Sequence, residues 1–178
     1  MEELRSTAFH RAGHAVVALH LSIAGAEVSL RATADNIGDS AIPDWVRPHD
    51  ELDDRGRSWL DDHVQVAWAG VLAEVEGCGA ALAAALAAAP GDLARIEELA
   101  AYVASEREEL DAYVEWMRCR TLNVLRHAWV APQLPVVANA LLERGVLSGR
   151  EVRALARTGH PAYAKAADQP GPAPDRPS

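Results

Sequence analysis

Two histidines near the start of the chain have the spacing of a metal-binding pair. His10 and His14 are four residues apart in the stretch His10-Arg11-Ala12-Gly13-His14. Residues four apart on an α-helix lie on one face with Cβ atoms about 5–6 Å apart, so both imidazoles can bind the same ion. The alternative for both side chains is a structural role, with their nitrogens satisfied by hydrogen bonds inside the fold.

Arg11 occupies a position that matters for the chemistry of such a pair. In the H-E-x-x-H pattern of zinc proteases, the residue after the first histidine is a glutamate that acts as general base. A guanidinium stays protonated at neutral pH and accepts no proton. A charge about 5 Å from a dication also costs several kcal/mol at an effective dielectric of about 20, unless the side chain turns to a carboxylate such as Glu74. The sequence therefore predicts metal ligands without the usual base.

The histidines need a helix to present them, and the sequence predicts one from a cap at Ser6 or Thr7 to about Leu21. Its apolar residues cover most of the circumference, which predicts a largely buried helix. Residues 26–32 then alternate apolar and polar side chains, as a half-buried strand does, and residues 40–45 can return as a second strand. We expect a small β-hairpin or sheet beside the metal-site helix.

The rest of the chain is predicted to be helical. Asp92 follows Pro90-Gly91 and suits the N-cap or first turn of a helix. Residues 105–108 and 148–151 both resemble capping boxes, and the turn before the second box is expected at residues 145–147. We expect a mainly α domain over residues 1–165, with a disordered Pro/Gly-rich tail at 166–178. The expected helices cover about residues 57–76, 80–89, 92–103, 105–127, 136–142 and 148–157.

Composition narrows the classes of function. The 178 residues carry a net charge of −9 and a pI near 5.2, which argues against a general nucleic-acid surface. No run of 18 apolar residues predicts a membrane segment, and the N-terminus does not resemble a signal peptide. Cys78 and Cys119 are expected to be two reduced thiols. We expect a cytoplasmic protein.

Several separated segments resemble one family, the M41 peptidases, which are the protease domains of FtsH-type, membrane-anchored, ATP-dependent zinc metalloproteases. Residues 8–18 (AFHRAGHAVVA) resemble that family's H-E-A-G-H-A-V-V-A helix, and residues 69–74 (AGVLAE) its A-G-x-x-A-E helix. Asp92 falls where the family has the aspartate that is its third zinc ligand. Residues 141–151 resemble the end of the domain. The resemblance covers about residues 7–157, and implies a zincin-like peptidase domain with zinc held by His10, His14 and Asp92.

The chain also departs from this family. Arg11 stands where that family has its catalytic glutamate, and we expect the ATPase module and membrane anchor that precede the motif in the family to be absent. We therefore expect a catalytically impaired domain that binds a peptide or protein partner in the former substrate groove. The alternative is an active or weakly active zinc metalloendopeptidase that uses His10, His14 and Asp92 together with another carboxylate. A third possibility is that Arg11 binds an anion in the cleft.

Two further segments have open roles. Glu74 can support a ligand histidine or lie on the surface, and the sequence favours the surface. Residues 28–32 are either a structural edge strand or one against which extended substrates pair, as in the M41 family.

Overall fold

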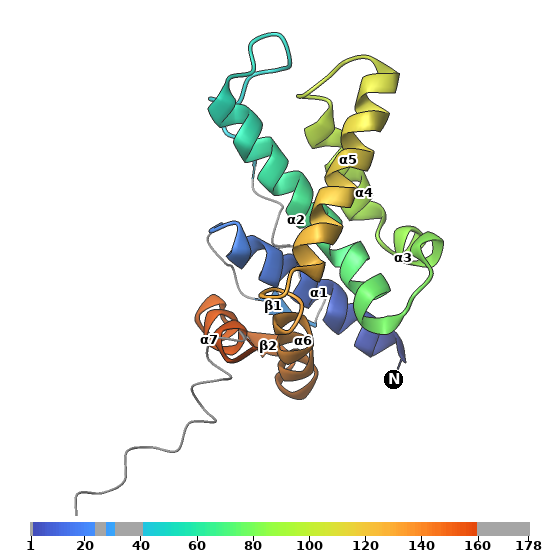
Figure 1. Ribbon diagram of the computed structural model, residues 1–178, viewed down its shortest axis with the longest axis vertical. Helices are drawn as coiled ribbons and strands as arrows, with labels where there is room; N and C mark the ends of the chain where they lie inside the picture. Colours follow the sequence, from blue (N-terminus) through green and yellow to red (C-terminus); the bar gives the residue numbers. More distant parts are fainter. Residues whose placement is uncertain (1, 24–27, 31–40, 160–178) are drawn as a thin grey trace, which may run out of the picture.

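The protein is mainly helical with a small antiparallel sheet, as the sequence predicts. The computed structural model describes residues 2–23, 28–30 and 41–159, so the predicted tail lies outside the described residues. Figure 1 shows the first helix between the helices that follow it and the last two helices of the chain. The helices are α1 (Glu2–His20), α2 (Asp54–Cys78), α3 (Leu82–Ala88), α4 (Pro90–Ala100), α5 (Arg107–Arg126), α6 (Gln133–Arg144) and α7 (Gly149–Gly159).

Helix α1 lies between two hydrophobic clusters. It packs against α2 and against α6, and it contributes Val17 to the cluster around α2 and Val16 to the cluster formed with α6, α7 and the sheet. Both valines are fully buried, and so are Ala8 and Ala12. Two packing partners require apolar residues around most of the helix, which confirms the predicted burial of this segment.

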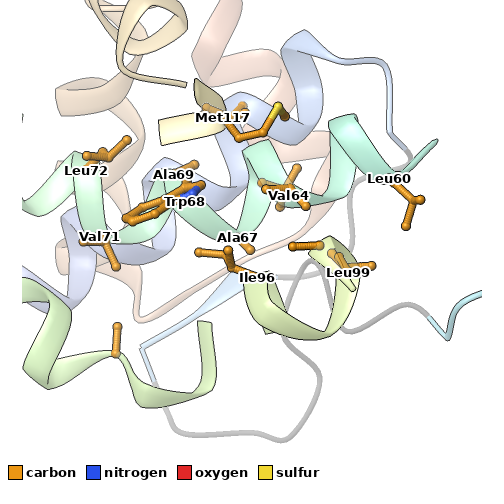
Figure 2. Close-up of a cluster of buried hydrophobic side chains, with 14 of the residues drawn as sticks. Leu60, Val64, Ala67, Trp68, Ala69, Val71, Leu72, Ile96, Leu99 and Met117 are labelled. Carbon is orange, nitrogen blue, oxygen red and sulfur yellow. The ribbon is translucent and has the colours of Figure 1, made fainter. Parts of the chain in front are cut away.

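The larger cluster follows α2. Figure 2 shows Met117 of α5 on one side of this helix and Ile96 and Leu99 of α4 on the other. These three side chains are buried in the same cluster as Val64 of α2. Helices α4 and α5 are thereby fixed relative to α2, and the fixed position of α4 sets where Asp92 lies.

The helix ends agree only in part with the predicted caps. The capping box at Ser148 is confirmed, because the Ser148 backbone N–H donates to Glu151 Oε2 at 2.8 Å and the Glu151 backbone N–H donates to Ser148 Oγ at 3.3 Å. The box expected at residues 105–108 is wrong, since the N-cap of α5 is Glu106 and no side chain caps it. Neither Ser6 nor Thr7 caps α1, which begins at Glu2. Sequence patterns near a cap do not show which side chain is already engaged elsewhere.

The first strand pairs with a different segment from the one predicted. Strand β1 (Val28–Ser29) pairs antiparallel with β2 (Val146–Leu147), with Val28 opposite Leu147. The hairpin prediction is wrong, because residues 41–45 form no strand. The turn expected at residues 145–147 is confined to Gly145, whose φ of 78° suits glycine. Val28 and Leu147 are both buried against α1 and α6, so long-range burial sets this pairing.

Among the described residues, no helix has the length and apolar character needed to cross a lipid bilayer. Cys78 and Cys119 are both free thiols.

Candidate metal centre

Three side chains that the sequence singled out converge in space. His10 and His14 project from α1, and Asp92 comes from the first turn of α4, where the sequence placed it. The His10 Nε2 atom lies 3.0 Å from His14 Nε2 and 3.0 Å from Asp92 Oδ2, and His14 Nε2 lies 3.5 Å from Asp92 Oδ2. Tetrahedral zinc with bonds of about 2.0–2.1 Å separates its ligand atoms by about 3.3 Å. The three atoms therefore match one face of a zinc coordination tetrahedron.

The other ring nitrogen of each histidine is held by the fold. His14 Nδ1 lies 2.7 Å from the carbonyl oxygen of Val66, which can only accept, so Nδ1 carries the proton. His10 Nδ1 lies 2.7 Å from Glu74 Oε1, and it donates to that carboxylate. In the neutral rings both Nε2 lone pairs then face Asp92. Metal-binding histidines almost always have such a hydrogen bond on their second nitrogen, because it fixes the tautomer and the ring orientation.

Asp92 presents an acceptor without a matched donor. Its Oδ2 atom is buried and makes no hydrogen bond of good geometry, although the Nε2 atoms of His10 and His14 are within 3.5 Å. Burial acts to raise the pKa of Asp92, but the contacts with His10 and His14 outweigh it and hold this pKa well below its usual range. The carboxylate is therefore ionised at neutral pH and available to a cation.

A proton at His10 balances the site when no metal is bound. Burial acts to lower the pKa of His10, but the contacts with Asp92 and Glu74 outweigh it and raise this pKa to about 9. At neutral pH the metal-free ring is an imidazolium whose Nε2–H donates to His14 Nε2 at 3.0 Å and whose charge lies beside the Asp92 carboxylate, with His10 Nε2 3.0 Å from Asp92 Oδ2. A metal ion at this point takes the place of that proton.

Glu74 is a supporting residue of the site, and the surface position that the sequence favoured is wrong. Its side chain is 9% exposed, and its Oε2 atom accepts a hydrogen bond from Ser6 Oγ while Oε1 accepts from His10. Burial acts to raise the pKa of Glu74, but these contacts with His10 and Ser6 outweigh it and lower the pKa. Glu74 thus holds one ligand ring in place and is held in turn by Ser6.

Two glycines allow α1 and α2 to approach closely enough to build the centre. A Cβ atom at Gly13 would lie 2.4 Å from the carbonyl oxygen of Ala69, so α2 packs directly on the α1 backbone there. A Cβ atom at Gly70 would lie 2.4 Å from His14 Nε2 and 2.7 Å from His10 Nε2. The missing side chain at Gly70 leaves space beside both ligand nitrogens. The sequence contained both glycines in its motifs, but only the crossing of the helices shows their role.

Arg11 lies on the same helix as the two histidines. The residues that converge as possible metal ligands in the described part of the chain are His10, His14 and Asp92. Arg11 is half-buried on α1 and precedes His14 by three residues, a spacing that makes the two side chains neighbours on the helix surface. The predicted role of residues 28–32 in binding substrate stays a prediction, and of these residues the structure describes 28–30.

No protein-family model matches the chain, and no curated protein matches it in sequence. The assignment of a metal centre therefore rests on the three converging ligand atoms, their hydrogen-bonded supports and the space beside Gly70.

Proposed function

We propose that this chain is an M41-type zinc metallopeptidase-like domain that binds zinc through His10, His14 and Asp92 and hydrolyses peptides poorly or not at all. The observation that carries the proposal is the triangle of Nε2, Nε2 and Oδ2 atoms with sides of 3.0, 3.0 and 3.5 Å. Three protein ligands of the types N, N and O, with a fourth position left open, are typical of catalytic zinc sites.

Zinc bound here would supply a Lewis acid that polarises a carbonyl oxygen. Peptide hydrolysis also needs a group that takes a proton from water, and Arg11 stands where that base is expected. Loss of a general base typically lowers the rate by about 10²–10⁴-fold. The ligand set supports metal binding, whereas Arg11 supports impaired catalysis.

Glu74 does not supply the missing base. Its carboxylate contacts His10 Nδ1, across the ring from the Nε2 atom that faces Asp92. Its second oxygen is engaged by Ser6. The sequence left open a fully active endopeptidase in which another carboxylate acts as the general base. Glu74 does not support this alternative.

A domain that keeps the ligands without the base is suited to binding. In this proposal a peptide or protein partner lies in the former substrate groove beside the metal and is held without being cut. The supports at Glu74 and Val66 favour a maintained site, because they fix both rings in the orientation that metal binding requires.

The test restores the missing base and measures hydrolysis of an unstructured protein such as casein in the presence of zinc. The native chain should show little or no cleavage, and Arg11→Glu should raise the rate by about 10²-fold or more. Arg107→Glu is a matched control, because Arg107 is 81% exposed on α5 and pairs with Asp111 away from the centre. The double variant Arg11→Glu, His14→Ala should lose the gained activity. A zinc-loaded, folded Arg11→Glu variant without any peptidase activity would refute the peptidase-like proposal.

A further inference from the structure

A pocket of about 450 Å³ lies where the first turns of α1 meet the ends of α2 and α5 and the start of α6. Its volume falls within the range of about 300–1,000 Å³ that is usual for small-molecule sites. None of His10, His14 and Asp92 lines it, so this pocket is separate from the candidate metal centre. The side chains around it determine which kind of molecule it can hold.

Apolar side chains from three helices form the inner surface of the pocket. Phe9 of α1, Leu125 of α5 and Leu134 of α6 line it, and each of them is 4% exposed or less. The Phe9 ring packs on the backbone of Gly77 near the end of α2, where an added Cβ atom would overlap the ring. A hydrocarbon group that enters the pocket leaves water for contact with these side chains, which favours its binding.

One positive charge at the pocket has no carboxylate partner. The guanidinium carbon of Arg5 lies 5.5 Å from the centre of the Phe9 ring, and the ion pairs among the described residues do not include Arg5, although Glu2 precedes it by three residues on α1. The second arginine of the lining, Arg126, donates to Glu76 through Nε at 2.9 Å and Nη2 at 2.8 Å. This pair is neutral as a whole. The lining therefore has one net positive charge, which is that of Arg5.

We propose that this pocket binds a small carboxylic acid with a hydrocarbon body, whose carboxylate pairs with Arg5 while its body covers Phe9 and Leu134. The guanidinium presents a planar fork of N–H donors that matches two carboxylate oxygens. One net positive charge suits a monoanion better than a phosphate group, which carries about −1.5 to −2 at pH 7 and would also lie near Glu76. A neutral apolar compound leaves Arg5 unmatched, and a short acid leaves the apolar surface in water. This inference needs no ion at the metal centre.

The experiment uses the full chain after a chelator has removed metal, so that no carboxylate can bind an ion at His10 and His14. Binding is followed by ¹H–¹⁵N NMR through the amide signals of Gly77 and Leu134. The probes are octanoate, octanamide, which has the same body without the charge, and acetate, which has the charge without the body. We expect octanoate to shift both signals and to bind at least about 10-fold more tightly than the other two compounds.

Two pairs of variants locate the site. Arg5→Gln should weaken octanoate binding by about 10-fold and leave octanamide binding unchanged, whereas Arg107→Gln, at an arginine 81% exposed on α5, should change neither. Ala131→Phe should fill the pocket and abolish octanoate binding. Ala128→Phe is its matched control, because Ala128 is also exposed and does not line the pocket. Arg5 and Ala131 are both exposed, so these substitutions leave the hydrophobic clusters intact.

Three results would overturn the proposal. Equal affinity for octanoate and octanamide, or an octanoate affinity that Arg5→Gln leaves unchanged, would show that Arg5 does not hold the carboxylate. Octanoate binding that persists in a folded Ala131→Phe protein would place the site elsewhere. Signals of Gly77 and Leu134 that no probe shifts would show that the pocket binds no such acid. Each of these failures leaves the proposed function standing, because the metal-free protein is tested and zinc binding is measured separately.

Discussion

Gly70 gives the sharpest structural test of the centre, because a single methyl group at this position enters the space next to both ligand nitrogens. The Cβ atom of Gly70→Ala would lie 2.4 Å from His14 Nε2 and 2.7 Å from His10 Nε2. Ordinary van der Waals contact begins near 3.4 Å. The imidazoles must therefore move by about 1 Å, whereas a metal site tolerates deviations of only about 0.2 Å in its bond lengths.

The magnitude follows from where the strain is carried. Forcing one extra methyl group into a packed site costs about 1–3 kcal/mol. The metal-free protein can relieve the strain by turning the two rings, and alanine in a helix interior gains about 1 kcal/mol over glycine. The metal-bound protein cannot turn the rings without losing ligands. We therefore expect zinc affinity to fall by about 10- to 100-fold or more while the stability of the metal-free domain changes little.

The assay is isothermal titration of the metal-free protein with Zn²⁺, together with thermal unfolding of the same samples. Gly91→Ala is the matched control, because a Cβ atom at Gly91 has no neighbour within 4 Å although the residue adjoins Asp92. This control should bind zinc as the native chain does. Native zinc affinity in a folded Gly70→Ala variant would refute the placement of the ion beside Gly70 between the two Nε2 atoms.

Four further predictions have defined outcomes. Glu74→Gln removes the charged partner of His10 Nδ1 and should lower zinc affinity by about 10- to 100-fold in the same titration, with the fold unchanged by circular dichroism. Zinc binding at pH 7 should release about one proton, because the pKa of His10 is raised to about 9 in the metal-free protein; titrations in buffers of different ionisation enthalpy measure this, and release of no proton contradicts it. The raised pKa of His10 also stabilises the metal-free domain. This stabilisation is complete below pH 6.5, the ordinary pKa of histidine, and is lost as the pH rises through 9. The melting temperature of the metal-free protein should therefore fall over that interval, and it should fall less in His10→Ala. Tyr113→Phe removes the 2.8 Å hydrogen bond to Asp61 on α2 and should cost about 0.5–1.5 kcal/mol in denaturant unfolding without changing zinc affinity.

The sequence predicts the two histidine ligands because local spacing determines most of their geometry. Any two residues that are four apart on a helix share a face, so the pairing of His10 and His14 follows from the sequence alone. Asp92 did not follow from spacing, because α2 and α3 separate it from the histidines, and only the resemblance to M41 peptidases pointed to it. The structure brings its Oδ2 atom to within 3.0 Å of His10 Nε2.

The errors concern features that depend on contacts between distant elements. Glu74 reads as a surface carboxylate because nothing local shows that α1 crosses α2 at this point and buries its side chain. Strand β1 lacks its predicted neighbour for a similar reason, since its partner β2 lies more than a hundred residues later. The sequence predicts Ser6 as a possible helix cap, but its hydroxyl donates to Glu74. A sequence pattern gives the side chains that can pair, and tertiary packing selects which of them do.

The zinc content of the purified chain tests the central claim most directly. After exposure to Zn²⁺ and dialysis, mass spectrometry should find about one zinc per native chain, the same amount in Asp111→Asn, and almost none in Asp92→Asn. Asp111 is a suitable control because it is an exposed aspartate that pairs with Arg107 on α5. A native chain without zinc, or an Asp92→Asn variant that keeps it, would contradict a centre formed by His10, His14 and Asp92.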